Sequence, residues 1–270
     1  MARAVEGDLF SESGGLVWHA KALLRHGTIW ADFRNRVDRF LTDWLGDIAL
    51  YPGEPVSGVI LIGPSGGWCL PRSGFLDQFA HVIAIDPDTV ARRVFLARHK
   101  RKPTKNARFT QEWTWIPSVF QNVLPALLNR HPHHAVLFCN VLGQLRYQQE
   151  KSLERIEFEI NQIKMMLEGR HWASFHDRIS GAGRLSDAQT YEFFEPAELP
   201  NQELLQGMTV SGEWLDHLTQ QVLPPELGRR FMLWPISQYR LHVIEAGWAN
   251  PNGIREVRTS DGSRSTRLGK

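Results

Sequence analysis

The sequence predicts an α/β fold with a mostly parallel sheet that ends in an antiparallel hairpin. Between residues 58 and 175, short apolar runs alternate with segments of helical periodicity, a pattern typical of parallel strands joined by crossover helices. Near the C-terminus, two β-rich runs, 230–234 and 239–245, are separated by only four residues. A connection this short joins antiparallel strands, because a parallel crossover needs about a dozen residues or more.

The first 57 residues are expected to form a helical extension before the sheet. Between residues 33 and 48, apolar side chains recur at intervals of three and four, which is typical of one buried helix face. Pro52, Gly53 and Pro55 then end the helical segment. The α/β domain is therefore expected to span residues 58–248.

The elements of this domain are predicted in the following order. Strands are expected at 58–62, 82–85, near 108–110, 135–139 and 172–175. Helices are expected between the first two strands, at 88–99, at 118–129 and along an apolar stripe from 153 to 167. Residues 181–228 form a long insertion between strands five and six, with a helix at 212–221. Residues 249–270 lack periodicity and are expected to form a disordered basic tail.

Two of these strands end in residues suited to a nucleoside cofactor. The first strand runs into a glycine-rich turn made of Gly63, Pro64, Ser65, Gly66 and Gly67. The second strand ends at Asp86, which lies 23 residues after Gly63. Glycines let the backbone approach a ligand closely, and an acid at this spacing accepts hydrogen bonds from ribose hydroxyls. The pattern predicts a Rossmann-like domain that binds a cofactor by its adenosine part.

Five alternating units closed by a hairpin resemble the class I S-adenosylmethionine-dependent methyltransferases, over roughly residues 58–248. Three segments carry the resemblance: 62–67 is similar to motif I, 84–86 to the ribose-binding end of the second strand, and 138–145 to the fourth-strand motif. The resemblance implies that Gly63 and Gly67 lie against the methionine part of S-adenosylmethionine and that Asp86 takes the ribose hydroxyls. Asn140, followed by Val141, would face the reactive end.

The same resemblance makes Glu112 a candidate partner of the adenine amino group, with Trp113 beside the adenine ring. The chain departs from the family at two positions, since Leu61 stands where an acid is usual and Ser65 replaces the middle glycine. These departures favour a second hypothesis, a catalytically inactive binding or scaffold protein with the same fold. A nicotinamide-dependent oxidoreductase is disfavoured by the closing hairpin and by Trp68 at the third glycine position.

The glycine turn also matches the G-x-S-x-G pattern of a nucleophile elbow. In that hypothesis Ser65 is the nucleophile of a serine hydrolase, with His242 or His176 as the base. The helical character of residues 1–57 speaks against it, because an α/β-hydrolase needs several strands before the elbow.

His176 and Asp177 follow the fifth strand, at the edge where Gly63, Asp86 and Asn140 are expected. His176 is the candidate general base for the acceptor proton, because the pKa of an imidazole lies near neutrality, and Asp177 is the alternative. Aromatic residues in the N-terminal extension and in the insertion favour a small or medium organic acceptor over nucleic acid. The predicted function is therefore methyl transfer from S-adenosylmethionine to such an acceptor.

Composition narrows the remaining possibilities. The net charge is +2, and no apolar run reaches the ~20 residues that a membrane span needs. Two cysteines, with no signal-peptide core, favour reduced thiols in a cytoplasmic protein. His131, His133 and His134 lie in a loop without matching ligands, so no metal site is predicted from them. The sequence makes no prediction about oligomeric state.

Overall fold

A computed structural model of the chain describes residues 15–72, 74–100, 109–147, 152–184, 191–208 and 212–251. Its strands are β1 (Gly58–Ile62), β2 (His81–Ile85), β3 (Glu112–Ile116), β4 (His134–Cys139), β5 (Trp172–Ala182), β6 (Glu192–Glu195), β7 (Trp214–Asp216), β8 (Arg229–Ser237) and β9 (Arg240–Ala249). Its α-helices are α2 (Gly15–Arg25), α3 (Ala31–Ala49), α4 (Thr89–His99), α5 (Leu124–Arg130), α6 (Leu153–Leu167) and α7 (Asn201–Met208).

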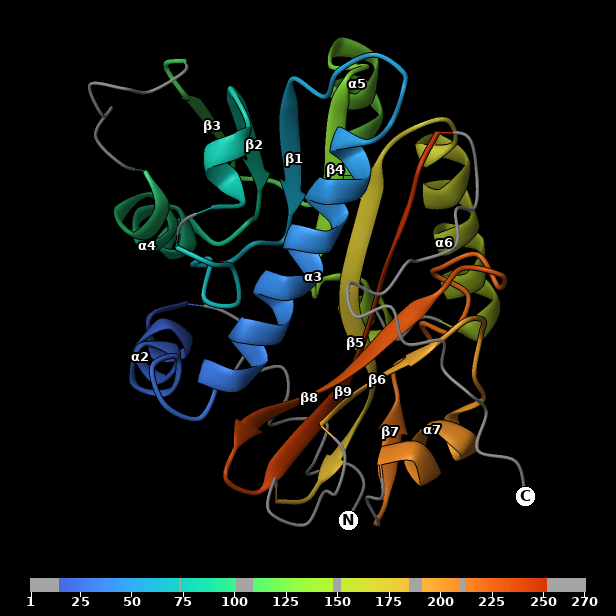
Figure 1. The fold of residues 1–270 in the computed structure, drawn as a ribbon. Coiled ribbons are helices and arrows are strands. Elements are labelled where there is room, and N and C mark those ends of the chain that lie inside the picture. The colour runs from blue at the N-terminus through green and yellow to red at the C-terminus, as the bar shows by residue number, and fades with distance from the viewer. Residues whose placement is uncertain are drawn as a thin grey trace.

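These strands form one mixed nine-stranded sheet in the order β3-β2-β1-β4-β5-β9-β8-β6, with β7 beside β5 (Figure 1). The strands β1 to β5 are parallel, as predicted. The strands β1, β2 and β4 carry mainly apolar residues on both faces, because helices cover both faces of the sheet. Val59 and Leu61 belong to the core under α3, whereas Ile60 and Ile62 belong to the core with α5 and α6. The predicted α/β fold is therefore confirmed.

The predicted antiparallel hairpin is also confirmed, by β8 and β9. The strand β9 lies between β8 and β5 and is antiparallel to both. The strand β5 continues to Ala182, beyond the expected end at residue 175, and all of its residues from Trp172 to Gly181 are buried. The sequence indicated an end because polar residues follow Phe175. In the fold these residues are paired with β9, so they stay in the sheet.

Three predicted elements are wrong. The third strand is β3, which begins at residue 112 rather than near 108–110, and residues 101–108 lie outside the described part of the chain. Between β1 and β2, the described residues (63–72 and 74–80) form no α-helix but a short 3₁₀ turn at Leu76–Gln78, consistent with Pro71 and Gly74 interrupting a helix. The helix expected at 212–221 is replaced by β7, which pairs with β5, and a helix lies earlier, at α7.

The N-terminal extension is helical, as predicted. In α3, the face that carries Phe33, Val37 and Trp44 is buried against the sheet, and Figure 1 shows this helix crossing one face of the sheet. The helix α2 is held to α4 by Asp88, whose Oδ2 accepts a hydrogen bond from the Gly15 amide at 2.8 Å. Residues 1–14 and the predicted tail from 252 onward lie outside the described residues. No helix in the described ranges combines the length and the apolar character needed to cross a membrane.

Candidate functional site

Hydrogen bonds connect the carboxyl ends of the parallel strands and bring together several of the predicted site residues. The Gly63 amide donates to the Ile85 carbonyl at 2.9 Å, which joins the glycine turn to the end of β2. The Asn140 amide group, after β4, donates from Nδ2 to Asp177 Oδ2 at 3.0 Å, which joins the end of β4 to the middle of β5. The glycine turn, Asp86 and Asn140 therefore lie at the carboxyl ends of their parallel strands, as expected, and their role in binding a ligand stays a prediction.

The glycine turn adopts the backbone conformation that glycine allows. Gly63 has φ of +64°, and a Cβ at this position would lie 2.7 Å from Val141 Cβ. Gly67 has φ of +67°, and a Cβ there would collide with the His99 imidazole. The space that a side chain at Gly63 or Gly67 would need is therefore occupied by Val141 and His99, respectively.

Asp86 at the end of β2 holds the glycine turn in place. Its Oδ2 accepts from the Ser65 amide at 2.8 Å, and its Oδ1 accepts from the Asp88 amide at 2.9 Å. Ser65 is a non-glycine residue at φ of +50°, and this hydrogen bond supports that unfavourable conformation. Burial raises the pKa of Asp86 to about 6, and the two backbone hydrogen bonds oppose this shift. Each carboxylate oxygen has two lone pairs, so further hydrogen bonds from hydroxyl groups remain available to Asp86.

The helix α2 contacts Trp68, the residue that follows the glycine turn. The indole Nε1 of Trp68 donates to His19 Nδ1 at 2.9 Å, and His19 Nε2 lies 3.2 Å from Asp88 Oδ2. Since His19 Nδ1 accepts, its Nε2 carries the proton and donates to Asp88. A hydrogen-bonded chain thus runs from the turn to the first residue before α4.

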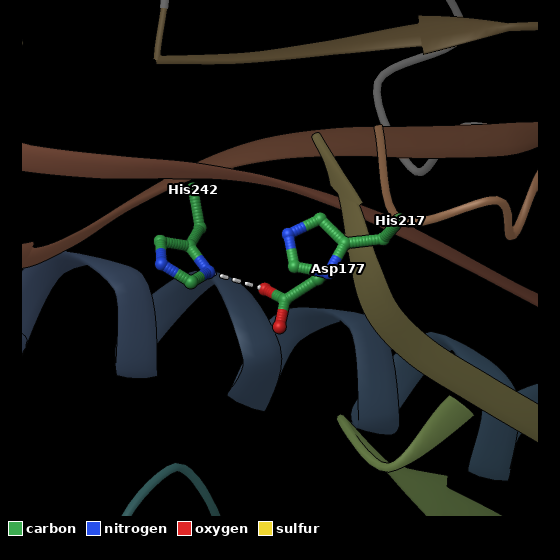
Figure 2. A group of neighbouring side chains, drawn as sticks. All are labelled: Asp177, His217 and His242. Atoms are coloured by element: carbon green, nitrogen blue, oxygen red, sulfur yellow. Dashed lines mark hydrogen bonds and ion pairs between the residues drawn. The ribbon is translucent and has the colours of Figure 1, made fainter. Parts of the chain in front are cut away.

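Asp177 is the centre of the polar cluster at this edge. Its Oδ1 lies 2.7 Å from His242 Nδ1 of β9, as Figure 2 shows, and its Oδ2 accepts from Asn140. Burial alone would raise the pKa of Asp177, but the charge and hydrogen bond of His242 hold it below its ordinary value. Asn140 Oδ1 and His242 Nε2 are buried and have no hydrogen-bond partner among the described residues. The predicted role of Asp177 in handling the acceptor proton stays a prediction.

His217 is a further member of the cluster, and the sequence did not identify it. Its Nδ1 lies 3.2 Å from the Gly143 carbonyl oxygen and its Nε2 lies 2.9 Å from Ser180 Oγ. A carbonyl only accepts, so Nδ1 carries the proton and Nε2 accepts from the Ser180 hydroxyl. Burial lowers the pKa of His217 to about 4, so the imidazole is neutral near neutral pH. Asp177, His217 and His242 each offer one ligand atom, and these atoms lie within 4.8 Å of one another.

His176 does not lie at the ligand edge, which corrects the predicted general base. Its side chain is completely buried, with Nδ1 2.9 Å from Ser174 Oγ and Nε2 3.4 Å from Glu245 Oε2. Successive residues of a strand point to opposite faces of the sheet, so when Asp177 faces the site, His176 faces away from it. His176 belongs instead to a buried ionic network in which Glu245 also binds Arg178 and Arg229.

Glu112 and Trp113 are also far from their predicted place. Glu112 pairs in register with His81, so both lie at the amino end of their parallel strands, and Glu112 Oε2 forms an exposed contact of 3.5 Å with His81 Nε2. Asp86 lies at the opposite end, roughly 13 Å or more away at about 3.3 Å per residue. The end of β3 that approaches Asp86 is Ile116, whose carbonyl accepts from the Asp86 amide at 3.2 Å. The adenine contact predicted for Glu112 is not compatible with this geometry.

The described part of the chain also places Ser65 and the histidines before β4, which the sequence suggested as alternative sites. No hydrogen bond connects the Ser65 hydroxyl to a histidine, and His242, the base of the hydrolase hypothesis, bonds to Asp177. His131 and His134 lie together with ring centroids 4.6 Å apart. His131 precedes β4 and His134 is its first residue, so both lie at the amino edge of the sheet.

The insertion reaches the site only in part. Thr219 Oγ1 donates to the Asp177 carbonyl at 2.8 Å, so the segment after β7 borders the cluster together with His217. The helix α7 packs through Leu204 and Met208 with Phe231 of β8, whereas α3 packs on the other face of this strand, with Met232. Among the described residues of the insertion, those at 217–219 are therefore placed to influence a ligand.

Comparison with protein-family models finds no match to this chain, and a search of curated proteins finds no significant relative. The features that bear on function are therefore those of the site itself: a glycine turn held by Asp86, followed at the same edge by Asn140, Asp177 and two histidines.

Proposed function

We propose that the protein is an S-adenosylmethionine-dependent methyltransferase with a Rossmann-like domain, acting on a small or medium organic acceptor. The observation that carries the proposal is the position of the glycine turn, Asp86 and Asn140 at one edge of a sheet whose five parallel strands are followed by a hairpin. This combination of order and edge residues is the one implied by the family resemblance. S-adenosylmethionine would supply an electrophilic methyl group on a sulfonium.

The chain's contribution would be alignment and exclusion of water. Asp86 would accept hydrogen bonds from the ribose hydroxyls through its remaining lone pairs, while its existing bonds keep the turn rigid. Asn140, with a buried Oδ1 that has no partner, would lie at the reacting end beside Asp177. Holding two reactants in a fixed orientation lowers the entropic part of the barrier, which is the main source of rate in a transfer of this kind.

Isothermal titration with S-adenosylmethionine and with its demethylated product tests the cofactor assignment. Replacing Asp86 with Ala should weaken binding by roughly 2–4 kcal/mol, because charge-assisted hydrogen bonds to ribose are lost. Asp77→Ala is a matched control, since Asp77 is an exposed acid in the same connection between β1 and β2. An Asp86→Ala variant with the dissociation constant of the unmodified protein would refute this placement.

A second candidate is a protein of the same fold that binds a ligand without transferring a methyl group. The observation in its favour is that the glycine turn is filled from within, by His99 at Gly67 and by Trp68 and His19 at Gly66. Titration separates the two candidates. Binding of the cofactor with transfer to any of a panel of small acceptors supports the methyltransferase. Binding without transfer across the same panel supports the second candidate.

A further inference from the structure

We propose that Asp177, His217 and His242 form a binding site for a divalent transition-metal ion such as Zn²⁺. Figure 2 shows the three side chains converging from β5, from the segment after β7 and from β9. Their ligand atoms lie within 4.8 Å of one another, and all three residues are buried. An ion with bonds of about 2.0–2.2 Å to each atom requires only small movements of these side chains.

The three donors match the chemistry of such an ion. Two imidazoles and one carboxylate favour zinc, iron, cobalt or manganese, whereas Mg²⁺ and Ca²⁺ prefer sites made of oxygen ligands alone. Three protein ligands leave further coordination positions for a substrate atom or water. The donors therefore define an open metal site rather than a closed structural one.

Hydrogen bonds to other groups already orient two of the ligands. The bond from Ser180 to His217 Nε2 and the bond between His242 and Asp177 Oδ1 would be replaced by bonds to the ion. His217 donates from Nδ1 to the Gly143 carbonyl, which leaves the lone pair on Nε2, the atom now accepting from Ser180. A ring nitrogen that donates to a backbone carbonyl is the usual support of a metal-binding histidine. Asp177 is supported in the same way, because Asn140 holds its Oδ2 and leaves Oδ1 to the cluster.

Hydrogen bonds within the protein do not satisfy every buried polar atom of the cluster. Buried polar groups in proteins are nearly always satisfied, yet no residue within the described ranges bonds to the buried Asn140 Oδ1 or His242 Nε2. The place of the site also fits a function, since it adjoins the edge where the glycine turn and Asp86 lie.

An ion here would give the proposed transfer reaction its acid–base chemistry. A metal lowers the pKa of a coordinated hydroxyl, so an acceptor bound to it would lose its proton near neutral pH. Asp177 would then act as a ligand. The metal site itself does not depend on the transfer reaction, because binding is measured without cofactor or acceptor.

The test is titration of the chelator-treated full chain with Zn²⁺, and with Co²⁺, whose visible absorption reports its ligands. One ion per chain is expected, and Mg²⁺ should not compete with it. His217→Gln and His242→Gln should each weaken Zn²⁺ binding by about 100-fold or more, and Asp177→Asn should alter the Co²⁺ spectrum. His131→Gln and His133→Gln are matched controls at the opposite edge of the sheet, and they should leave the affinity unchanged.

Circular dichroism of each variant without metal separates loss of the site from loss of folding. The Co²⁺ spectrum of the unmodified protein gives a second measurement that needs no variant, since nitrogen ligands produce bands that a hydrated ion lacks. Failure of the unmodified chain to bind Zn²⁺, or equal affinity in folded His217→Gln and His242→Gln variants, would overturn the proposal. Metal binding in a chain that does not bind S-adenosylmethionine would leave this proposal standing and remove the proposed function.

Discussion

Asp86 makes the stability of the protein depend on pH. Burial raises the pKa of Asp86 to about 6 in the folded chain, above the value of about 3.9 for an unfolded aspartate. Between these two values the folded chain binds more protons than the unfolded chain. The contribution of Asp86 to the free energy of unfolding is therefore present below about pH 4 and is lost as the pH rises through about 6.

Chemical denaturation of the unmodified protein and of Asp86→Asn, from about pH 4 to about pH 7, measures this effect. The difference in the free energy of unfolding between the two proteins should change by about 2 kcal/mol over that range, with the unmodified protein losing stability as the pH rises. Comparing the two proteins cancels the titration of all other groups. A difference that stays constant with pH would contradict the raised pKa.

The positions of some site residues could be predicted from the sequence, and those of others could not. Asp86 and Asn140 were placed correctly, because each directly follows an apolar strand. His217 was not found, since it follows a three-residue strand in a polar insertion and reaches Asp177 only through the pairing of β7 with β5. His176 was chosen wrongly, although the alternation of faces along β5 already separates it from Asp177.

Asp88 links two helices through one carboxylate. Its Oδ1 accepts from the amides of Val90 and Ala91 at the start of α4, and its Oδ2 accepts from Gly15 and His19 of α2. Since the same side chain caps one helix and anchors another, we expect Asp88→Ala to lower the free energy of unfolding by about 2–3 kcal/mol.

Asp88→Asn is the informative control for this prediction. Asparagine is a good capping residue, so it should restore the cap of α4 but not the two bonds to α2. Hydrogen exchange would then show α2 opening more easily in Asp88→Asn, while α4 stays protected. Equal protection of α2 in Asp88→Asn and in the unmodified chain would show that α2 is held by other contacts.

At the level of elements, the hydrophobic periodicity of the sequence predicted those helices and strands whose apolar pattern is contained within the segment itself. The buried face of α3 and the strands β1, β2, β4, β8 and β9 follow from apolar patterns of period 3.6 or 2. The third strand was placed too early, and so Glu112 was assigned to the wrong end of it. The extension of β5 was missed because its polar residues are compensated by Glu245 and His242 of β9, which lie more than 60 residues away in sequence.

The whole sheet is held together across its parallel and antiparallel halves by a buried ionic network. Glu245 of β9 binds Arg178 of β5 at 3.2 Å and also Arg229 of β8, and all three side chains are fully buried. Removing a partner from such a network leaves charges buried and uncompensated, which is strongly destabilising. Glu245→Ala should therefore lower the free energy of unfolding by about 3–5 kcal/mol.

Equilibrium unfolding in urea, followed by fluorescence and by circular dichroism, measures this loss. Glu203→Ala on α7 serves as the control because Glu203 is exposed, and its effect should stay within about 0.5 kcal/mol. If Glu245→Ala cost less than about 1 kcal/mol, the network would not be what joins the two halves of the sheet.

The position of β9 between β5 and β8 has a consequence for how the protein is made. A chain still attached to the ribosome and ending before residue 240 would lack the strand that separates β5 from β8. The parallel strands could pair early during synthesis, but β5 and β8 would present open edges until β9 emerged. His242 arrives with that strand, so the cluster around Asp177 is assembled last. Nascent chains arrested before β9 are thus the species in which unwanted strand pairing, and a need for chaperones, should be greatest.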